Sequence, residues 1–157
     1  MKYKVPLMQN AFFSEELTKK KLSKFIIKSK KLSMDKNCIK FEKQFAKFHK
    51  SKYAVFFNSG SSSNLAMLQT LLNLKKIKIG DKVAFSSLTW ATNVMPIIQL
   101  GFKPIPLDID TNTLNISLSE LRKIDKCKVL LITNALGFSS DLPKIKKICK
   151  KKKIIII

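Results

Sequence analysis

One stretch decides the fold class: Val55-Phe56-Phe57-Asn58-Ser59-Gly60-Ser61-Ser62-Ser63-Asn64-Leu65. An apolar run passes here through a single glycine directly into a helical pattern, whose apolar face carries Leu65, Leu68, Leu71 and Leu72. Short, continuous apolar runs are typical of strands that are buried on both faces. The stretch therefore predicts a buried strand followed at once by a helix, the unit from which parallel sheets are built.

The same alternation continues to the end of the chain. Apolar, β-rich runs occupy residues 53–57, 82–86, 103–107, 128–133 and 154–157, and amphipathic helical patterns occupy residues 62–73, 91–100, 117–124 and 142–152. Strands that alternate with helices predict an α/β fold with a largely parallel sheet, covered by helices on both faces. Ligands of such sheets bind at the carboxyl ends of the strands.

Residues 1–50 lack this alternation and are expected to form a helical lead-in. After an extended start near Val5, Ser14 is expected to cap a helix that has Glu15 and Glu16 in its first turn. Its apolar stripe would consist of Leu17, Leu22, Phe25 and Ile26. A second helix is expected over residues 37–49. No linker separates residues 1–50 from residues 51–157, so we interpret the chain, 1–157, as one domain or a part of one.

The charge of the chain is strongly positive, with 31 Lys and Arg against 10 Asp and Glu. A formal net charge of +21 raises the possibility of a non-enzymatic, basic nucleic-acid-binding protein. Arg122 is the single arginine, however, and the lysines are dispersed along the chain. Surfaces that recognise phosphates or base edges favour the planar guanidinium. We therefore favour a lysine-rich composition over specific nucleic-acid binding.

Three cysteines, Cys38, Cys127 and Cys149, are too widely spaced for a zinc site or a disulfide framework, and we expect reduced core thiols and no metal. No stretch approaches the ~20 apolar residues that cross a bilayer. The N-terminus has no uninterrupted apolar segment of the secretory kind. A cytoplasmic protein without membrane partners is expected.

The helix that begins near Gly60 is the first candidate site. A helix start presents free backbone N–H groups at its positive end, and the hydroxyls of Ser59, Ser61 and Ser62 stand beside them. These features suit a phosphate group, although neither standard nucleotide-binding glycine motif is present. From these residues alone, a phosphate site and a simple serine cap are equally supported.

The second candidate is Trp90, which follows the strand expected over residues 82–86 and is the single tryptophan of the chain. It could stack on a flat ring, or it could belong to the core, where a single tryptophan is more common. Two further strand ends carry polar residues. Asp110 is expected to form only a turn. Asn134 is expected either to line a site or to cap a loop.

These residues resemble the DegT/DnrJ family of sugar aminotransferases and its relatives, the sugar 3-dehydrases. The resembling pieces, in the family's order, are Phe41-Glu42 with Phe45-Ala46, Tyr53-Ala54-Val55 with Asn58-Ser59-Gly60-Ser61, Gly80-Asp81-Lys82-Val83, Thr89-Trp90-Ala91-Thr92, residues 104–110 and Thr113-Leu114-Asn115-Ile116. The resemblance implies the three-layer large domain of fold-type I aminotransferases, here incomplete. It also implies a homodimer and a part in sugar or polysaccharide biosynthesis.

The resemblance further implies a cofactor, pyridoxal 5'-phosphate or pyridoxamine 5'-phosphate. Gly60, Ser61 and Ser62 would hold its phosphate, and Trp90 would stack on its ring. The family transfers an amino group, usually from glutamate, to a nucleotide-linked keto-sugar. The 3-dehydrase branch is the alternative, because residues 58–65 and Trp90-Ala91-Thr92 resemble that branch more closely. In that branch a histidine replaces the lysine that binds the cofactor.

The chain departs from the family pattern at several positions. Asp35 and Lys50 stand where glycines are usual, and Asn134 stands where many members have histidine. After residues 154–157 the family has an acidic pair, and much later the cofactor-binding lysine. Neither is found in this sequence, so no catalytic residue and no substrate-binding residue is assigned. We expect a truncated enzyme that has no aminotransferase activity on its own.

Overall fold

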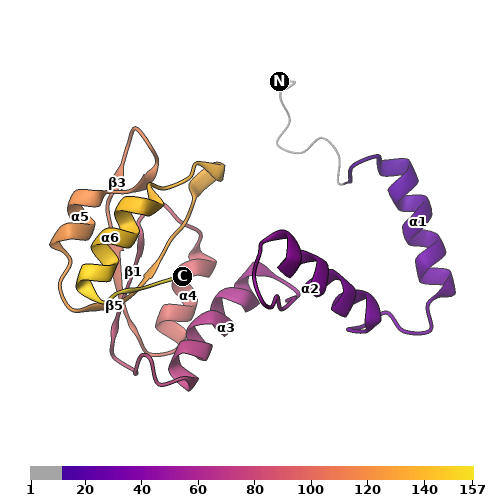
Figure 1. The fold of residues 1–157 in the computed structure, drawn as a ribbon, viewed down its shortest axis with the longest axis horizontal. Helices are drawn as coiled ribbons and strands as arrows, with labels where there is room; N and C mark the ends of the chain where they lie inside the picture. Colours follow the sequence, from indigo (N-terminus) through magenta and orange to yellow (C-terminus); the bar gives the residue numbers. More distant parts are fainter. Residues whose placement is uncertain (1–11) are drawn as a thin grey trace. The chain divides into compact units, whose positions relative to one another are not determined.

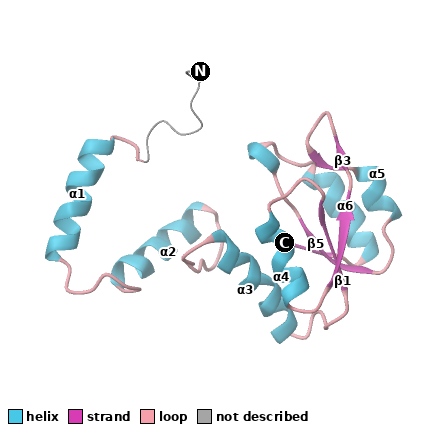
Figure 2. Ribbon diagram, turned by 180° about the vertical axis from the view of Figure 1, so that it is seen from behind, coloured by secondary structure: helices cyan, strands magenta, loops and turns pink. Residues whose placement is uncertain are grey.

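The computed structural model describes residues 12–157 of the chain. The extended start expected near Val5 lies outside the described residues. The chain divides into two compact units, Met1–Phe56 and Phe57–Ile157, and each is treated by itself. Figure 1 follows the elements along the sequence, and Figure 2 shows the same ribbon from behind.

The first unit contains α1 (Glu15–Lys28) and α2 (Lys36–Phe48), in agreement with the expected lead-in. Ser14 stands at the N-cap of α1, but the expectation that it caps the helix is wrong, because its side chain makes no capping bond. Capping requires an extended backbone, and Ser14 has a φ of 46°. Within the described residues, the apolar stripe of α1 is exposed and no residue of this helix is buried.

The prediction of a strand over residues 53–57 is also wrong. A strand persists only where a neighbour satisfies its backbone groups, and no strand within residues 12–157 pairs with this segment. The Glu42 carboxylate of α2 accepts the N–H of Phe56 at 2.8 Å instead. The ring of Phe56 packs edge-on against Phe41, with the ring centroids 5.4 Å apart.

The second unit is an α/β fold, as expected. Its parallel sheet has the order β2-β1-β5-β6, with β1 (Lys82–Ser86), β2 (Lys103–Leu107), β5 (Cys127–Leu131) and β6 (Ile155–Ile156). The helices are α3 (Gly60–Asn73), α4 (Ala91–Gln99), α5 (Leu118–Lys123) and α6 (Leu142–Lys152). A short antiparallel pair, β3 (Ile109–Asp110) and β4 (Asn115–Ile116), and a 3-10 turn, η1 (Ala135–Gly137), complete the unit.

Two apolar clusters cover the two faces of this sheet. Val83 and Phe85 of β1 point to one face, where Leu68 of α3 and Ile97 of α4 are fully buried. Ala84 points to the other face and packs in the cluster that contains Leu121 of α5 and Ile145 of α6. Because both faces of β1 are buried, its sequence is a continuous apolar run and does not alternate with polar residues.

Prolines close the β2 edge of the sheet. Lys103 donates its N–H to Asp81 O at 2.9 Å, on the side of β1. Backbone N–H groups point alternately to the two sides of a strand. Pro104 and Pro106 occupy the alternate positions, whose N–H groups would face away from β1. Proline has no N–H, and this edge therefore cannot pair fully with a further strand.

Several helices end in a residue with left-handed backbone conformation, where glycine is the usual choice. Gly101 fills this place after α4, at φ 74°, but Lys50 follows α2 at φ 52° and Lys75 follows α3 at φ 54°. The turn at Lys75 is closed by the N–H of Lys76, which donates to Leu71 O at 3.0 Å. A side chain in this conformation costs about 1 kcal/mol. Lys50, which stands where the family has glycine, thus keeps a backbone conformation that favours glycine.

We expect Lys75→Gly to raise the free energy of unfolding by roughly 0.5–1 kcal/mol, because glycine removes the left-handed strain at a small cost in chain entropy. The matched control is Lys76→Gly at the next position, which is outside the left-handed region and should be neutral or destabilising. Urea unfolding followed by circular dichroism measures both variants. A Lys75→Gly protein no more stable than Lys76→Gly would contradict this account of the helix end.

Two buried serines give a second test of the core. Ser86 ends β1 and is fully buried, and its Oγ has no hydrogen-bond partner within residues 12–157. Ser140 is also buried, and its Oγ donates to Asn115 Oδ1 at 2.9 Å. Burial of an unpaired hydroxyl costs desolvation energy that no hydrogen bond offsets. Removal of a paired hydroxyl instead leaves its buried partner without a hydrogen bond.

Ser86→Ala is therefore expected to leave the free energy of unfolding unchanged or to raise it by up to about 1 kcal/mol. Ser140→Ala should lower it by about 1–2 kcal/mol, since the buried Asn115 oxygen then lacks a donor. Thermal or urea unfolding of the two alanine variants provides the comparison. Equal destabilisation in both would mean that the Ser86 hydroxyl has a partner after all.

Candidate functional site

The first turn of α3 combines a serine cap with free backbone donors. Ser59 has an extended backbone at the N-cap, and its Oγ accepts the N–H of Ser62 at 3.2 Å. The N–H groups of Gly60 and Ser61 precede the first hydrogen bond within the helix and have no acceptor there. A Cβ built on Gly60 would meet no atom within 4 Å, so the space in front of it is open.

The charge around this helix start suits an anion. The sequence has no Asp or Glu between Asn58 and Gly80, and α3 has no acidic residue in its first turn. Its positive end is therefore not neutralised by its own side chains. The serine cap is confirmed, and two N–H groups remain available beside it. The phosphate role of Gly60, Ser61 and Ser62 stays a prediction.

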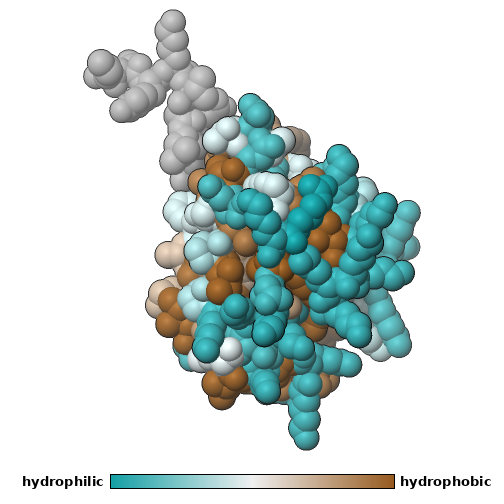
Figure 3. All heavy atoms as spheres, turned by 90° about the vertical axis from the view of Figure 1, so that its left-hand side faces the viewer, coloured by the Kyte–Doolittle hydropathy of each residue, from teal (hydrophilic) through white to brown (hydrophobic). Residues whose placement is uncertain are grey.

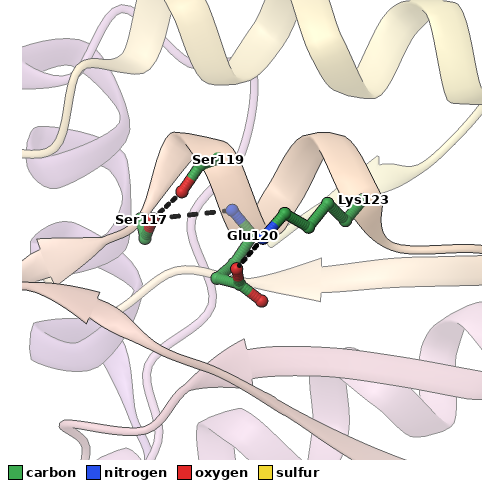
Figure 4. A network of polar contacts seen from close by, with 4 residues as sticks. All are labelled: Ser117, Ser119, Glu120 and Lys123. Atoms are coloured by element: carbon green, nitrogen blue, oxygen red, sulfur yellow. Dashed lines mark hydrogen bonds and ion pairs between the residues drawn. The ribbon is translucent and has the colours of Figure 1, made fainter.

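The start of α5 shows how a helix of this chain looks when its positive end is already satisfied (Figure 4). Ser117 caps it weakly, with Glu120 N at 3.5 Å from the serine Oγ, and its hydroxyl also pairs with Ser119 at 2.7 Å. Glu120 sits in the first turn and accepts a hydrogen bond from Lys123 at 2.8 Å. The first turn of α5 thus carries a carboxylate, whereas the first turn of α3 carries none.

Trp90 stands at the N-cap of α4, four residues after the end of β1 at Ser86, and 79% of it is exposed. The alternative that it belongs to the core is therefore wrong. The indole lines a cavity of 280 Å³, which we call the Trp90 cavity, together with Leu88, Thr89, Thr133, Ala135 and Leu136. These residues follow β1 and β5, so the cavity lies at the carboxyl ends of two neighbouring strands.

Side-chain hydrogen bonds join the two candidate segments. Asn64 of α3 donates from Nδ2 to Asn93 Oδ1 of α4 at 2.6 Å and to Thr92 O at 3.4 Å. Asn64 is the fifth residue of α3 and Asn93 is the third residue of α4, so these bonds bring the N-terminal parts of the two helices together. The Ser59 turn and Trp90 are thus brought to the same edge of the sheet.

The network continues from α4 to the strand ends. Asn93 donates from Nδ2 to Thr89 Oγ1 at 2.7 Å and to Thr133 Oγ1 at 3.2 Å. The two threonine hydroxyls are 2.7 Å apart and bonded to each other. Asn64, Asn93, Thr89 and Thr133 were not among the predicted site residues. Their polar character, after strand ends and near helix starts, was the available signal.

The other two polar candidates have structural roles. Asp110 Oδ1 accepts the N–H of Asn112 at 2.9 Å, which confirms the expected turn. Asn134 Oδ1 accepts the backbone N–H of Ser140 at 3.0 Å. Asn134 therefore closes a loop, although its neighbours Thr133 and Ala135 line the Trp90 cavity.

The lysines of α6 are exposed to solvent. Figure 3 shows hydrophilic side chains gathered on the side that carries α5 and α6.

Cys127 and Cys149 are buried in the apolar cluster beneath α5 and α6. Burial raises the pKa of both thiols, so they stay protonated at neutral pH. Within residues 12–157, no helix is long and apolar enough to span a bilayer.

The chain is similar to proteins of known activity. GDP-4-keto-6-deoxy-D-mannose 3-dehydratase of Yersinia pseudotuberculosis is 38% identical over 136 residues, which cover 84% of this chain and 35% of that protein. The E. coli enzyme of that name, solved with bound hydrated PLP, superposes with a TM-score of 0.87 at 34% identity, over 96% of this chain and 39% of the other.

A transaminase is also similar. The dTDP-3-amino-3,6-dideoxy-alpha-D-galactopyranose transaminase of Aneurinibacillus thermoaerophilus is 27% identical over 119 residues, which cover 74% of this chain and 32% of that protein. The chain thus spans between 32% and 39% of the length of these relatives. The model of the DegT/DnrJ/EryC1/StrS aminotransferase family matches residues 14–157. The chain therefore belongs to the DegT/DnrJ/EryC1/StrS aminotransferase family, and its fold is that of the fold-type I enzymes.

Proposed function

We propose that this chain supplies the cofactor-binding part of an enzyme that acts on a nucleotide-linked keto-sugar, with pyridoxal or pyridoxamine 5'-phosphate as cofactor. One observation carries the proposal: the Asn64–Asn93 hydrogen bond joins an acid-free helix start to an exposed indole. A phosphate and a flat ring on one small molecule match these two features.

The roles follow from the donors that each residue offers. The N–H groups of Gly60 and Ser61 bind phosphate oxygens at the positive end of α3. The Ser62 hydroxyl accepts from Ser59 Oγ at 3.2 Å, so its own proton is available as a third donor. Trp90 offers its exposed face to the ring. The bound cofactor supplies an electron sink for chemistry at the sugar carbon.

Two reactions are candidates, amination of the keto-sugar and removal of its 3-hydroxyl group. The family as a whole supports amination, with glutamate as the amino donor. The 3-dehydratases are the more similar relatives, at 38% identity against 27% for the transaminase, and this favours dehydration as the second candidate. A homodimer in the cytoplasm and a part in polysaccharide biosynthesis complete the proposal.

The test follows the fluorescence of Trp90, the single tryptophan of the chain, as pyridoxamine 5'-phosphate is added. The amine form is chosen because an aldehyde would react with the many lysines. The wild type is expected to show saturable quenching that pyridoxamine without phosphate reproduces only weakly. Ser61→Asp should weaken binding about tenfold or more, because a carboxylate then occupies the anion site while it favours the helix.

The matched control is Ser119→Asp, which places the same charge at the equivalent second position of α5 and should leave binding unchanged. Both variants place a negative charge near the positive end of a helix, which is favourable for helix stability, so their circular dichroism spectra should agree. The proposed function is wrong if the wild type does not bind, or if Ser119→Asp weakens binding as much as Ser61→Asp.

A further inference from the structure

The hydrogen bonds that surround Asn93 have a fixed direction. Thr92 O can only accept, so the atom of Asn64 that faces it at 3.4 Å must be the amide nitrogen. The same nitrogen lies 2.6 Å from the side chain of Asn93, which must therefore present its oxygen to Asn64. The Asn93 nitrogen is left to face the two threonines. The order of donation is Asn64, then Asn93, then Thr89 and Thr133.

A count of protons at the threonine pair follows from this direction. Both hydroxyl oxygens receive an N–H of Asn93, at 2.7 Å for Thr89 and 3.2 Å for Thr133. The two hydroxyls carry two protons, and the bond between them uses one. The other proton has no acceptor within residues 12–157. Thr89 and Thr133 both line the Trp90 cavity, so this donor is available to a molecule that lies there.

We propose that the Thr89–Thr133 pair is a specificity determinant, which donates one hydrogen bond to an acceptor atom on the ring of the molecule stacked on Trp90, and that Asn93 is the positioning residue that orients it. The inference rests on the proposed function and adds a ring contact to it. An aromatic phosphate with a nitrogen or oxygen acceptor on its ring is the class of ligand that fits. A ring without acceptors would leave the half-buried donor unpaired, which costs affinity.

The test compares two aromatic phosphates by titration calorimetry on the full chain. Pyridoxamine 5'-phosphate has acceptors on its ring, and benzyl phosphate has none. The ratio of their dissociation constants measures ring recognition, because phosphate binding is common to both. The double variant Thr89→Val with Thr133→Val removes both hydroxyls, and the preference for pyridoxamine 5'-phosphate should fall about three- to tenfold. Thr89→Ser with Thr133→Ser keeps both hydroxyls and should keep the preference.

Asn93→Asp provides a second variant of nearly unchanged shape. A carboxylate still accepts from Asn64, but it also accepts from both threonines, so both hydroxyl protons turn away from the cavity. The negative charge of the new carboxylate weakens the binding of both phosphates alike, so the ratio of their dissociation constants still reports the ring contact alone. The same fall in preference is expected, and this variant decides the matter if the valine protein does not fold.

Three results are informative. A fall in preference in the valine or aspartate protein, together with its retention in the serine protein, supports the inference. An unchanged preference in both the valine and the aspartate proteins overturns it and leaves the proposed function intact. If the wild type binds neither phosphate, the proposed function and this inference both fail.

Discussion

The hydrogen bond between Asn64 and Asn93 is the constraint on which the candidate site depends. It joins the N-terminal parts of two helices that are separated in the sequence by the strand β1, with Asn64 Nδ2 and Asn93 Oδ1 2.6 Å apart. Leu68 of α3 and Ile97 of α4, both fully buried on the same face of the sheet, hold the bodies of these helices in place. Apolar packing thus sets the distance between the helices, and the amide pair sets how their starts face each other.

This arrangement gives each part of the site a different physical origin. The anion donors come from the backbone of α3, because a helix start always leaves N–H groups unpaired. The flat platform comes from Trp90, which is exposed because it stands at the N-cap of α4 and not within an apolar face. The threonine pair belongs to the ends of β1 and β5. A parallel sheet brings such ends together, which is why residues distant in sequence can share one ligand.

Much of the second unit could be predicted from the sequence. The strands at 82–86 and 103–107 and the helix at 142–152 have the predicted bounds, because continuous apolar runs and 3.6-residue periodicity are strong local signals. The segment 53–57 has the same composition but no neighbouring strand, and composition alone cannot supply one. The exposure of Trp90 and the Asn64–Asn93 pair depend on tertiary packing, which no local pattern encodes.

The side-chain hydrogen bond between Asn64 and Asn93 holds the two helix starts together before any ligand binds. A double-mutant cycle with Asn64→Ala, Asn93→Ala and the double variant measures this directly, with the free energy of unfolding from urea titrations as the readout. The account predicts a coupling of about 1 kcal/mol between the two sites, because each single change removes the same hydrogen bond. Additive effects, equal within about 0.3 kcal/mol, would contradict it.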